Sequence, residues 1–157
     1  KNVVFLETKN EGFVSNVTSI LNSLINEETQ IVLVTTNMNR AFEDDEVSND
    51  NLSNLQFHYG AMSKEYDVEN KVSFIKNFKR AYGEEPSKMA VRGFDVTMDI
   101  VLRLVTSDDL YKSVQEPTVT SYVENKFAYK KKMFGGYYNT SAYLVKHSNL
   151  KIVEVKQ

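Results

Sequence analysis

Apolar positions in the first part of the chain alternate between continuous runs and a helical spacing. Residues 3–6 and 31–34 are short continuous apolar runs, typical of strands buried on both faces. Between them, Asn10 is a residue type that favours the N-cap of a helix. The apolar positions that follow it at helical spacing are Phe13, Val17, Ile20, Leu21 and Leu24. This order predicts a βαβ unit with parallel strands.

The next stretch is predicted to contain a polar connection and a third strand. Residues 37–54 are polar and rich in turn formers, and we interpret them as surface with a helical turn around residues 41–47. The acidic run 43–46 is interpreted as a solvated loop, because a calcium-binding loop needs a glycine in its turn and none follows here. Residues 55–59 alternate between apolar and polar positions, which predicts a strand.

Two helices are predicted after this strand. The first covers residues 68–82, with Asp67 as its cap and Gly83 as the left-handed residue that ends it. Its apolar stripe consists of Val72, Ile75, Phe78 and Tyr82. Pro86 is expected in the first turn of the second helix. The side chains that this second helix is expected to bury are Ala90, Phe94, Met98, Val101 and Val105.

The pattern changes near residue 106, after which strands dominate. A short helix is expected around residues 110–114, followed by strands at 126–132, 137–146 and 151–156. The turns between these strands are expected at Gly135-Gly136 and at Ser148-Asn149. The predicted fold class is therefore α/β: a parallel sheet with flanking helices, plus a C-terminal antiparallel meander. Residues 1–105 and 106–157 form two portions, or together one compact domain.

Composition and charge exclude several function classes. The 157-residue chain has a net charge of −2, which argues against a dedicated nucleic-acid binder. It contains no cysteine, so disulfides, thiol nucleophiles and sulfur-ligated metals are excluded. No apolar run is long enough to span a bilayer, and no signal peptide precedes the first strand.

The common catalytic motifs are absent. The sequence has no G-x-S-x-G, no P-loop, no H-E-x-x-H and no G-x-G-x-x-G. His58 and His147 are far apart in the sequence, and both are interpreted as strand or surface residues. We therefore predict no catalytic residue, no metal site and no cofactor, and we do not expect an enzyme.

Two charged segments each allow two interpretations. Arg92, Asp95, Asp99 and Arg103 lie on one helix face and form either an acid–base site or a run of surface ion pairs. We favour ion pairs on a solvent-facing or lobe-connecting surface. Residues 126–132, KFAYKKK, fit either nucleic-acid stacking or an exposed edge strand protected by lysines; we favour the edge strand.

The order of elements resembles the C-terminal half of type I periplasmic binding proteins, in particular the branched-chain amino-acid receptor group. The segments that carry this resemblance are VVFLETKNEGFVSNVTSILNSL, IVLVTTN, LQFHYG and FIKNFKRAYGEEPSKMAVRGFDVTMDIVLRL. The matching motif positions are Phe74, Phe78, Tyr82, Pro86, Ala90, Gly93, Phe94 and Asp95. The ending KFAYKKKMFGGYYNTSAYLVKHSNLKIVEV is also similar to envelope proteins that couple this domain to a LysM module.

The resemblance implies a two-lobed receptor that binds a small polar ligand in an interlobe cleft, without catalysis. It implies an ABC-transporter-type solute-binding domain in the periplasm or cell envelope of a Gram-negative bacterium, with a first lobe and the start of the second preceding Lys1. The ligand would be an amino acid or a peptidoglycan fragment, and a domain outside this chain would associate with peptidoglycan. The alternatives are an envelope scaffold or regulator with a vestigial cleft, or a flavodoxin- or receiver-like domain.

The ligand in such a sheet binds beyond the carboxyl ends of the strands. The candidates at these ends are Glu7, Thr8, Lys9, Thr36 and Asn37. A carboxylate there would pair with a ligand ammonium, and the threonine and asparagine side chains would donate or accept hydrogen bonds. The family often has aromatic residues after the first of these strands, where this chain has Glu7-Thr8-Lys9-Asn10.

Overall fold

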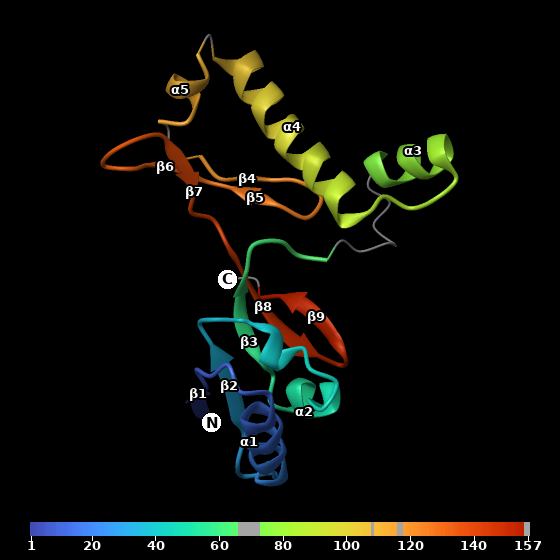
Figure 1. Ribbon diagram of the computed structural model, residues 1–157, viewed down its shortest axis with the longest axis vertical. Helices are drawn as coiled ribbons and strands as arrows, with labels where there is room; N and C mark the ends of the chain where they lie inside the picture. The colour runs from blue at the N-terminus through green and yellow to red at the C-terminus, as the bar shows by residue number, and fades with distance from the viewer. Residues whose placement is uncertain (66–72, 108, 116–117, 156–157) are drawn as a thin grey trace. The chain divides into compact units, whose positions relative to one another are not determined.

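The computed structural model describes residues 1–65, 73–107, 109–115 and 118–155 (Figure 1). Contacts along the chain divide it into two compact units. Unit 1 consists of Lys1–Ala61 and Tyr143–Gln157, and unit 2 of Met62–Ala142. The polypeptide therefore leaves unit 1 after Ala61 and returns to it at Tyr143. The portion boundary expected near residue 106 falls within unit 2 and stays a prediction.

Unit 1 is built on a five-stranded mixed sheet with the strand order β1-β2-β3-β8-β9 (Figure 1). The strands are β1 (Asn2–Phe5), β2 (Ile31–Thr35), β3 (His58–Ala61), β8 (Tyr143–Ser148) and β9 (Lys151–Glu154). Strands β1, β2 and β3 are parallel, β8 is antiparallel to β3, and β9 is antiparallel to β8. The predicted α/β class with a parallel sheet is confirmed.

The prediction that the first strand is buried on both faces is wrong. Strand β1 lies at the edge of the sheet, where Val3 and Phe5 are exposed while Val4 and Leu6 pack against the core. Successive side chains of a strand point to opposite faces, so only one face of β1 is covered within unit 1. Strand β2 has a neighbour on each side and is buried along most of its length, as predicted.

Helix α1 (Glu11–Ser23) begins where the sequence predicts. Asn10 is the N-cap, and its Oδ1 accepts a 2.8 Å hydrogen bond from the backbone N–H of Phe13. The buried side of the helix differs from the prediction by about one position: Val14 and Thr18 are buried, with Val17 and Leu21 packed beside the core. Three of the residues expected inside are exposed, namely Phe13, Ile20 and Leu24.

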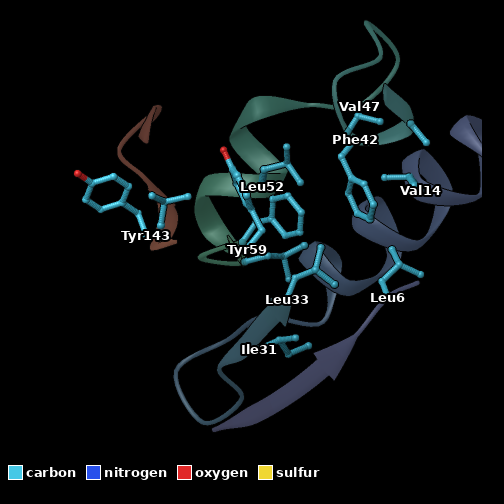
Figure 2. Packing of buried hydrophobic residues seen from close by; sticks show 13 residues of the cluster. Leu6, Val14, Ile31, Leu33, Phe42, Val47, Leu52, Tyr59 and Tyr143 are labelled. Atoms are coloured by element: carbon cyan, nitrogen blue, oxygen red, sulfur yellow. The ribbon is translucent and has the colours of Figure 1, made fainter. Parts of the chain in front are cut away.

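The connection between β2 and β3 contributes to the core, contrary to the prediction of a surface segment. It forms the short 3-10 helix η1 (Arg40–Phe42) and helix α2 (Asn49–Asn54). Phe42, Val47 and Leu52 are buried, and the ring of Phe42 stacks on Phe57 with 5.0 Å between centroids. Figure 2 shows these apolar side chains gathered with Val14 and with the strand residues. Together with the buried Ala41, these three residues are four apolar side chains of a polar stretch that belong to the core.

Unit 2 contains helices and two small antiparallel sheets. Its helices are α3 (Ser73–Tyr82), α4 (Lys88–Thr106) and α5 (Leu110–Ser113); its strands are β4 (Thr120–Ser121), β5 (Lys126–Phe127), β6 (Tyr129–Lys131) and β7 (Tyr137–Asn139). β4 pairs with β5, and β6 with β7. The predicted start of the first helix, including Asp67 and Val72, lies outside the described residues. The short helix expected around residues 110–114 is confirmed.

The end of α3 agrees with the prediction, and the start of α4 differs from it. Gly83 has φ +78°, the left-handed conformation expected after a helix. Helix α4, however, begins at Lys88, because Ser87 is its N-cap and accepts a 3.3 Å hydrogen bond from the N–H of Ala90. Pro86 therefore precedes the helix and is not in its first turn.

The predicted antiparallel strands of the C-terminal part are confirmed, and they form separate hairpins in place of one continuous meander. Strands β6 and β7 form a separate hairpin around Gly135 in unit 2, whereas β8 and β9 join the main sheet of unit 1 beside β3. The single segment predicted over residues 137–146 is divided between β7 and β8. Local propensity identifies strands, but it does not say which of them pair.

Candidate functional site

The carboxyl ends of β1 and β2 bring two of the predicted site residues into contact. The strands are neighbours in parallel register, with Phe5 opposite Val34, so the residues after them meet at the same edge. Glu7 Oε1 accepts hydrogen bonds from the N–H of Thr36 at 2.6 Å and from its hydroxyl at 2.8 Å. The hydroxyl of Thr35 lies 3.3 Å from the same oxygen. This arrangement fixes one oxygen of an exposed carboxylate.

These hydrogen bonds keep Glu7 ionised. The backbone N–H of Thr36, followed by its hydroxyl, lowers the pKa of Glu7, because both stabilise the charged form. Among the described residues all three donors contact Oε1, so Oε2 receives no hydrogen bond from them. An ionised, exposed oxygen at a sheet edge is a suitable acceptor for an ammonium group.

Thr8 and Asn37 are linked by a residue that sequence reasoning missed. Asn39 Nδ2 donates to the carbonyl of Thr8 at 3.0 Å and to the carbonyl of Asn37 at 2.9 Å. Its Oδ1 accepts from the N–H of Ala41 and caps η1. Asparagine often caps helices, and this preference was the available signal. Lys9 is exposed and makes no hydrogen bond with the described residues at this edge.

A second polar group lies on a helix of unit 2, where the sequence suggested that four charged residues, Arg92, Asp95, Asp99 and Arg103, lie at the surface. Helix α4 buries Val91, Asp95, Asp99 and Arg103. Of the residues expected inside, Ala90, Phe94 and Met98 are only partly buried, while Val101 and Val105 are 47% and 77% exposed. The prediction of the buried face is therefore wrong, and so is the assignment of the charges to solvent. Of these four charged residues, only Arg92 is exposed.

Asp99 is the acceptor for four side chains. Oδ2 accepts from Arg103 Nε at 2.9 Å and from the hydroxyl of Tyr129 at 3.0 Å. Oδ1 accepts from the hydroxyls of Thr120 at 2.5 Å and Tyr122 at 3.1 Å. Burial alone would raise the pKa of Asp99, but the hydrogen bonds from Arg103, Thr120 and Tyr129, together with the charge of Arg103, lower it overall. The same environment, burial first and then the charge of Asp99, raises the pKa of Tyr129 to about 12.

Asp95 fixes the loop between β4 and β5. Its carboxylate accepts hydrogen bonds from the backbone N–H groups of Val123, Glu124 and Asn125, at 3.1, 2.9 and 2.9 Å. The side-chain amide of Asn125 adds a fourth bond at 2.9 Å. All of these groups are buried, so the carboxylate replaces the water that the three amides would otherwise bind. Asp95, which follows Gly93 and Phe94 in the motif that carries the family resemblance, thus holds a loop in place.

Arg103 lines two pockets. One, of about 390 Å³, is lined mainly by hydroxyl-bearing side chains and Lys112. The other, of about 290 Å³, is lined by Leu110, Val114 and three tyrosines, with Asp99 and Arg103 also on its wall. Since both charged groups are already hydrogen-bonded to each other, neither pocket presents an unpaired charge from this pair.

Within the described residues, no cluster of three or more His, Asp or Glu side chains could hold a metal ion. None of the helices described is both long and apolar enough to cross a lipid bilayer. Comparison with models of protein families, with curated proteins and with solved structures found no match to the chain.

Proposed function

We propose that the chain is part of a solute-binding receptor of the type I periplasmic binding protein class, acting in the periplasm or envelope of a Gram-negative bacterium. It takes a small polar ligand with an ammonium group, such as an amino acid or a peptidoglycan fragment, and performs no catalysis. In this proposal the site includes the carboxyl edge of β1 and β2, with Glu7 as the residue that meets the ammonium.

The observation that carries the proposal is the geometry of Glu7. Its Oε1 is held by Thr36, and its ionised form is favoured by the same hydrogen bonds. A carboxylate fixed in this way loses little conformational freedom when it binds a cation, which favours affinity. Parallel strands that end together are also the place where ligands of open α/β sheets bind.

Two features of the chain support a role within a larger receptor. The polypeptide passes from unit 1 to unit 2 and back, at 61–62 and at 142–143, as the resemblance implies for a chain that serves two lobes. Unit 2 has a small apolar cluster of Ile75, Val91 and Val123, with Phe74 and Phe94 beside it. The exposed apolar side of α4 is what a lobe would show if further elements completed its core.

The alternative of a receiver-like domain is less well supported. Such a domain needs several acidic side chains at the end of its first strand, and Glu7 is the one acidic residue between Lys1 and Asn10. The envelope-scaffold alternative shares the fold and differs in that the edge binds nothing. Peptidoglycan association through a domain outside this chain is compatible with both hypotheses.

A thermal-shift screen separates these alternatives. The chain is heated with each standard amino acid and with muropeptide fragments, and melting is followed by circular dichroism. A ligand at about one hundred times its Kd stabilises the folded state by about 2.7 kcal/mol, which raises Tm measurably. Stabilisation by a ligand with an ammonium group, and not by its N-acetylated form, supports the proposal. No stabilisation by any compound favours the scaffold.

A further inference from the structure

The β6–β7 hairpin of unit 2 presents an apolar tip beside a group of lysines. Met133 and Phe134 are 90% and 87% exposed, the two highest values among the large hydrophobic residues described. Lys130, Lys131 and Lys132 directly precede them and are exposed as well. In Figure 1 the turn that joins β6 to β7 extends away from helix α4. We propose that this hairpin attaches the protein to the surface of an anionic lipid bilayer.

The hairpin is anchored on one face and free on the other. The hydroxyl of Tyr129 donates to Asp99, and the ring of Tyr137 lies 6.1 Å from that of Tyr111, so this face is held to the helices. Lys130 lies opposite Tyr138 in the ladder, on the other face, and Lys132 Nζ lies 5.7 Å from the Tyr138 ring centroid. Because one face of the hairpin is held to the helices, the tip has a fixed position from which it can insert into the bilayer surface.

The charge around the tip favours an anionic partner. From Asn125 to Val153 the sequence contains no aspartate or glutamate, while Lys126, Lys130, Lys131 and Lys132 lie in or next to the hairpin. The whole chain is acidic, so this positive charge is local. Basic side chains next to a short apolar wedge provide the two signals, electrostatic and hydrophobic, that stable attachment to a membrane surface requires.

A nucleic acid fits the same segment less well. Stacking of bases needs exposed aromatic faces beside the lysines. Phe127 is buried, and Tyr129 is occupied by its hydrogen bond to Asp99 and by Arg103, whose guanidinium lies 5.0 Å from the ring centroid. The exposed rings beside the lysines are Phe134 and Tyr138, and Lys132 Nζ already lies 5.7 Å from the Tyr138 ring centroid. Phe134 alone is a small platform for a strand whose successive bases need successive rings. A stable protein interface also needs about 800 Å² from each partner, far more than the two side chains of the tip supply.

Co-sedimentation of the 157-residue chain with lipid vesicles tests the proposal. Vesicles of phosphatidylcholine alone are compared with vesicles in which part of this lipid is replaced by phosphatidylglycerol. We expect binding to the anionic vesicles only, and strong weakening at high salt. Met133→Ser with Phe134→Ser should weaken binding about tenfold, because both side chains leave the hydrocarbon boundary. Replacing Lys130, Lys131 and Lys132 by Gln should weaken it about a hundredfold.

The matched control is the pair Met89→Ser and Val105→Ser on α4, which are 75% and 77% exposed in the same unit. Binding should be unchanged in this control. All of these positions are exposed, so circular dichroism of the variants should match the wild type. The proposal is overturned by equal binding to neutral and anionic vesicles, by no binding, or by loss of binding in the α4 control. Binding that depends on the lysines but not on Met133 and Phe134 contradicts the insertion of the tip. Binding of single-stranded RNA in place of vesicles assigns the hairpin to nucleic acid.

Discussion

Arg103 Nε donates a 2.9 Å hydrogen bond to Asp99 Oδ2, one helical turn earlier on α4, and the two side chains are 6% and 0% exposed. An i,i+4 pair on a helix is ordinarily a surface feature of small energetic value. Here it is enclosed by Thr120, Tyr122 and Tyr129, which donate to the same carboxylate. Removal of either partner would therefore leave a buried charge without compensation.

Asp99→Ala should lower the free energy of unfolding by about 3–5 kcal/mol, the usual cost of breaking a buried pair. Urea unfolding followed by circular dichroism measures this loss. Lys79→Ala is the matched control, since Lys79 pairs with Glu85 at 3.1 Å on the surface and should cost about 0.2–1 kcal/mol. A loss of similar size in the two variants would contradict the structural role of Asp99.

Asp95→Ala should release the loop of residues 123–125. Three backbone amides and one side-chain amide lose their acceptor in a buried place, which should cost about 3 kcal/mol or more. Hydrogen exchange read by NMR should show faster exchange at Val123, Glu124 and Asn125, while the amides of α1 keep their protection. Unchanged exchange at these three amides would show that Asp95 does not hold the loop.

The apolar side of α4 should tolerate polar substitution in this chain. Val101→Ser and Val105→Ser are expected to change the free energy of unfolding by less than about 0.5 kcal/mol, because both residues are exposed. The buried Val91 provides the comparison, and Val91→Ala should cost about 2 kcal/mol. If the two exposed valines cost as much as Val91, the assignment of the buried face is wrong.

His147 should make unit 1 sensitive to acid. Its ring lies against Phe57 and Tyr59, and its buried Nε2 has no hydrogen-bond partner among the described residues. Burial lowers the pKa of His147 below its ordinary 6.5, so the unfolded chain binds a proton more readily than the folded one. Stability is therefore fully present above pH 6.5 and falls as the pH decreases through 6.5 towards the lower pKa of the folded state.

Urea unfolding at a series of pH values measures this effect. His147→Phe should flatten the loss of stability below pH 6.5 relative to the wild-type chain. The same slope in wild type and His147→Phe would exclude His147 as its source.

The sequence predicts the elements of this fold better than it predicts their faces. The continuous runs of β2 and the N-cap at Asn10 are local signals, and both are confirmed. By contrast, no local signal in the sequence identifies the buried face of α4. Residues 100–102 and 104–105 are all apolar, so hydrophobic spacing alone could not reveal that Asp95 and Asp99 face inward. Apart from Arg103, their partners lie more than twenty residues later, in strands β4 and β6 and in the loop after β4, which the charge pattern of one helix does not indicate.

The candidate site likewise combines one contact that the sequence predicts with others that it does not. Glu7 and Thr36 follow two parallel strands, so their meeting could be predicted from the βαβ order. Asn39 could not be placed, because its link between Thr8 and Asn37 depends on the path of the loop into η1.

The most direct test of the account is ligand binding by Glu7 itself. The amide resonance of Thr36 is followed by ¹⁵N NMR while the wild-type chain and Glu7→Gln are titrated with the standard amino acids. Glu11→Gln is the control, an exposed acid in the first turn of α1. We expect the Thr36 amide to shift with at least one amino acid, unchanged affinity in Glu11→Gln, and at least about tenfold weaker binding in Glu7→Gln, because the charge-assisted bond to the ammonium is lost. Equal affinity in wild type and Glu7→Gln, or no shift at Thr36 with any amino acid, would contradict the proposal that Glu7 binds the ligand ammonium.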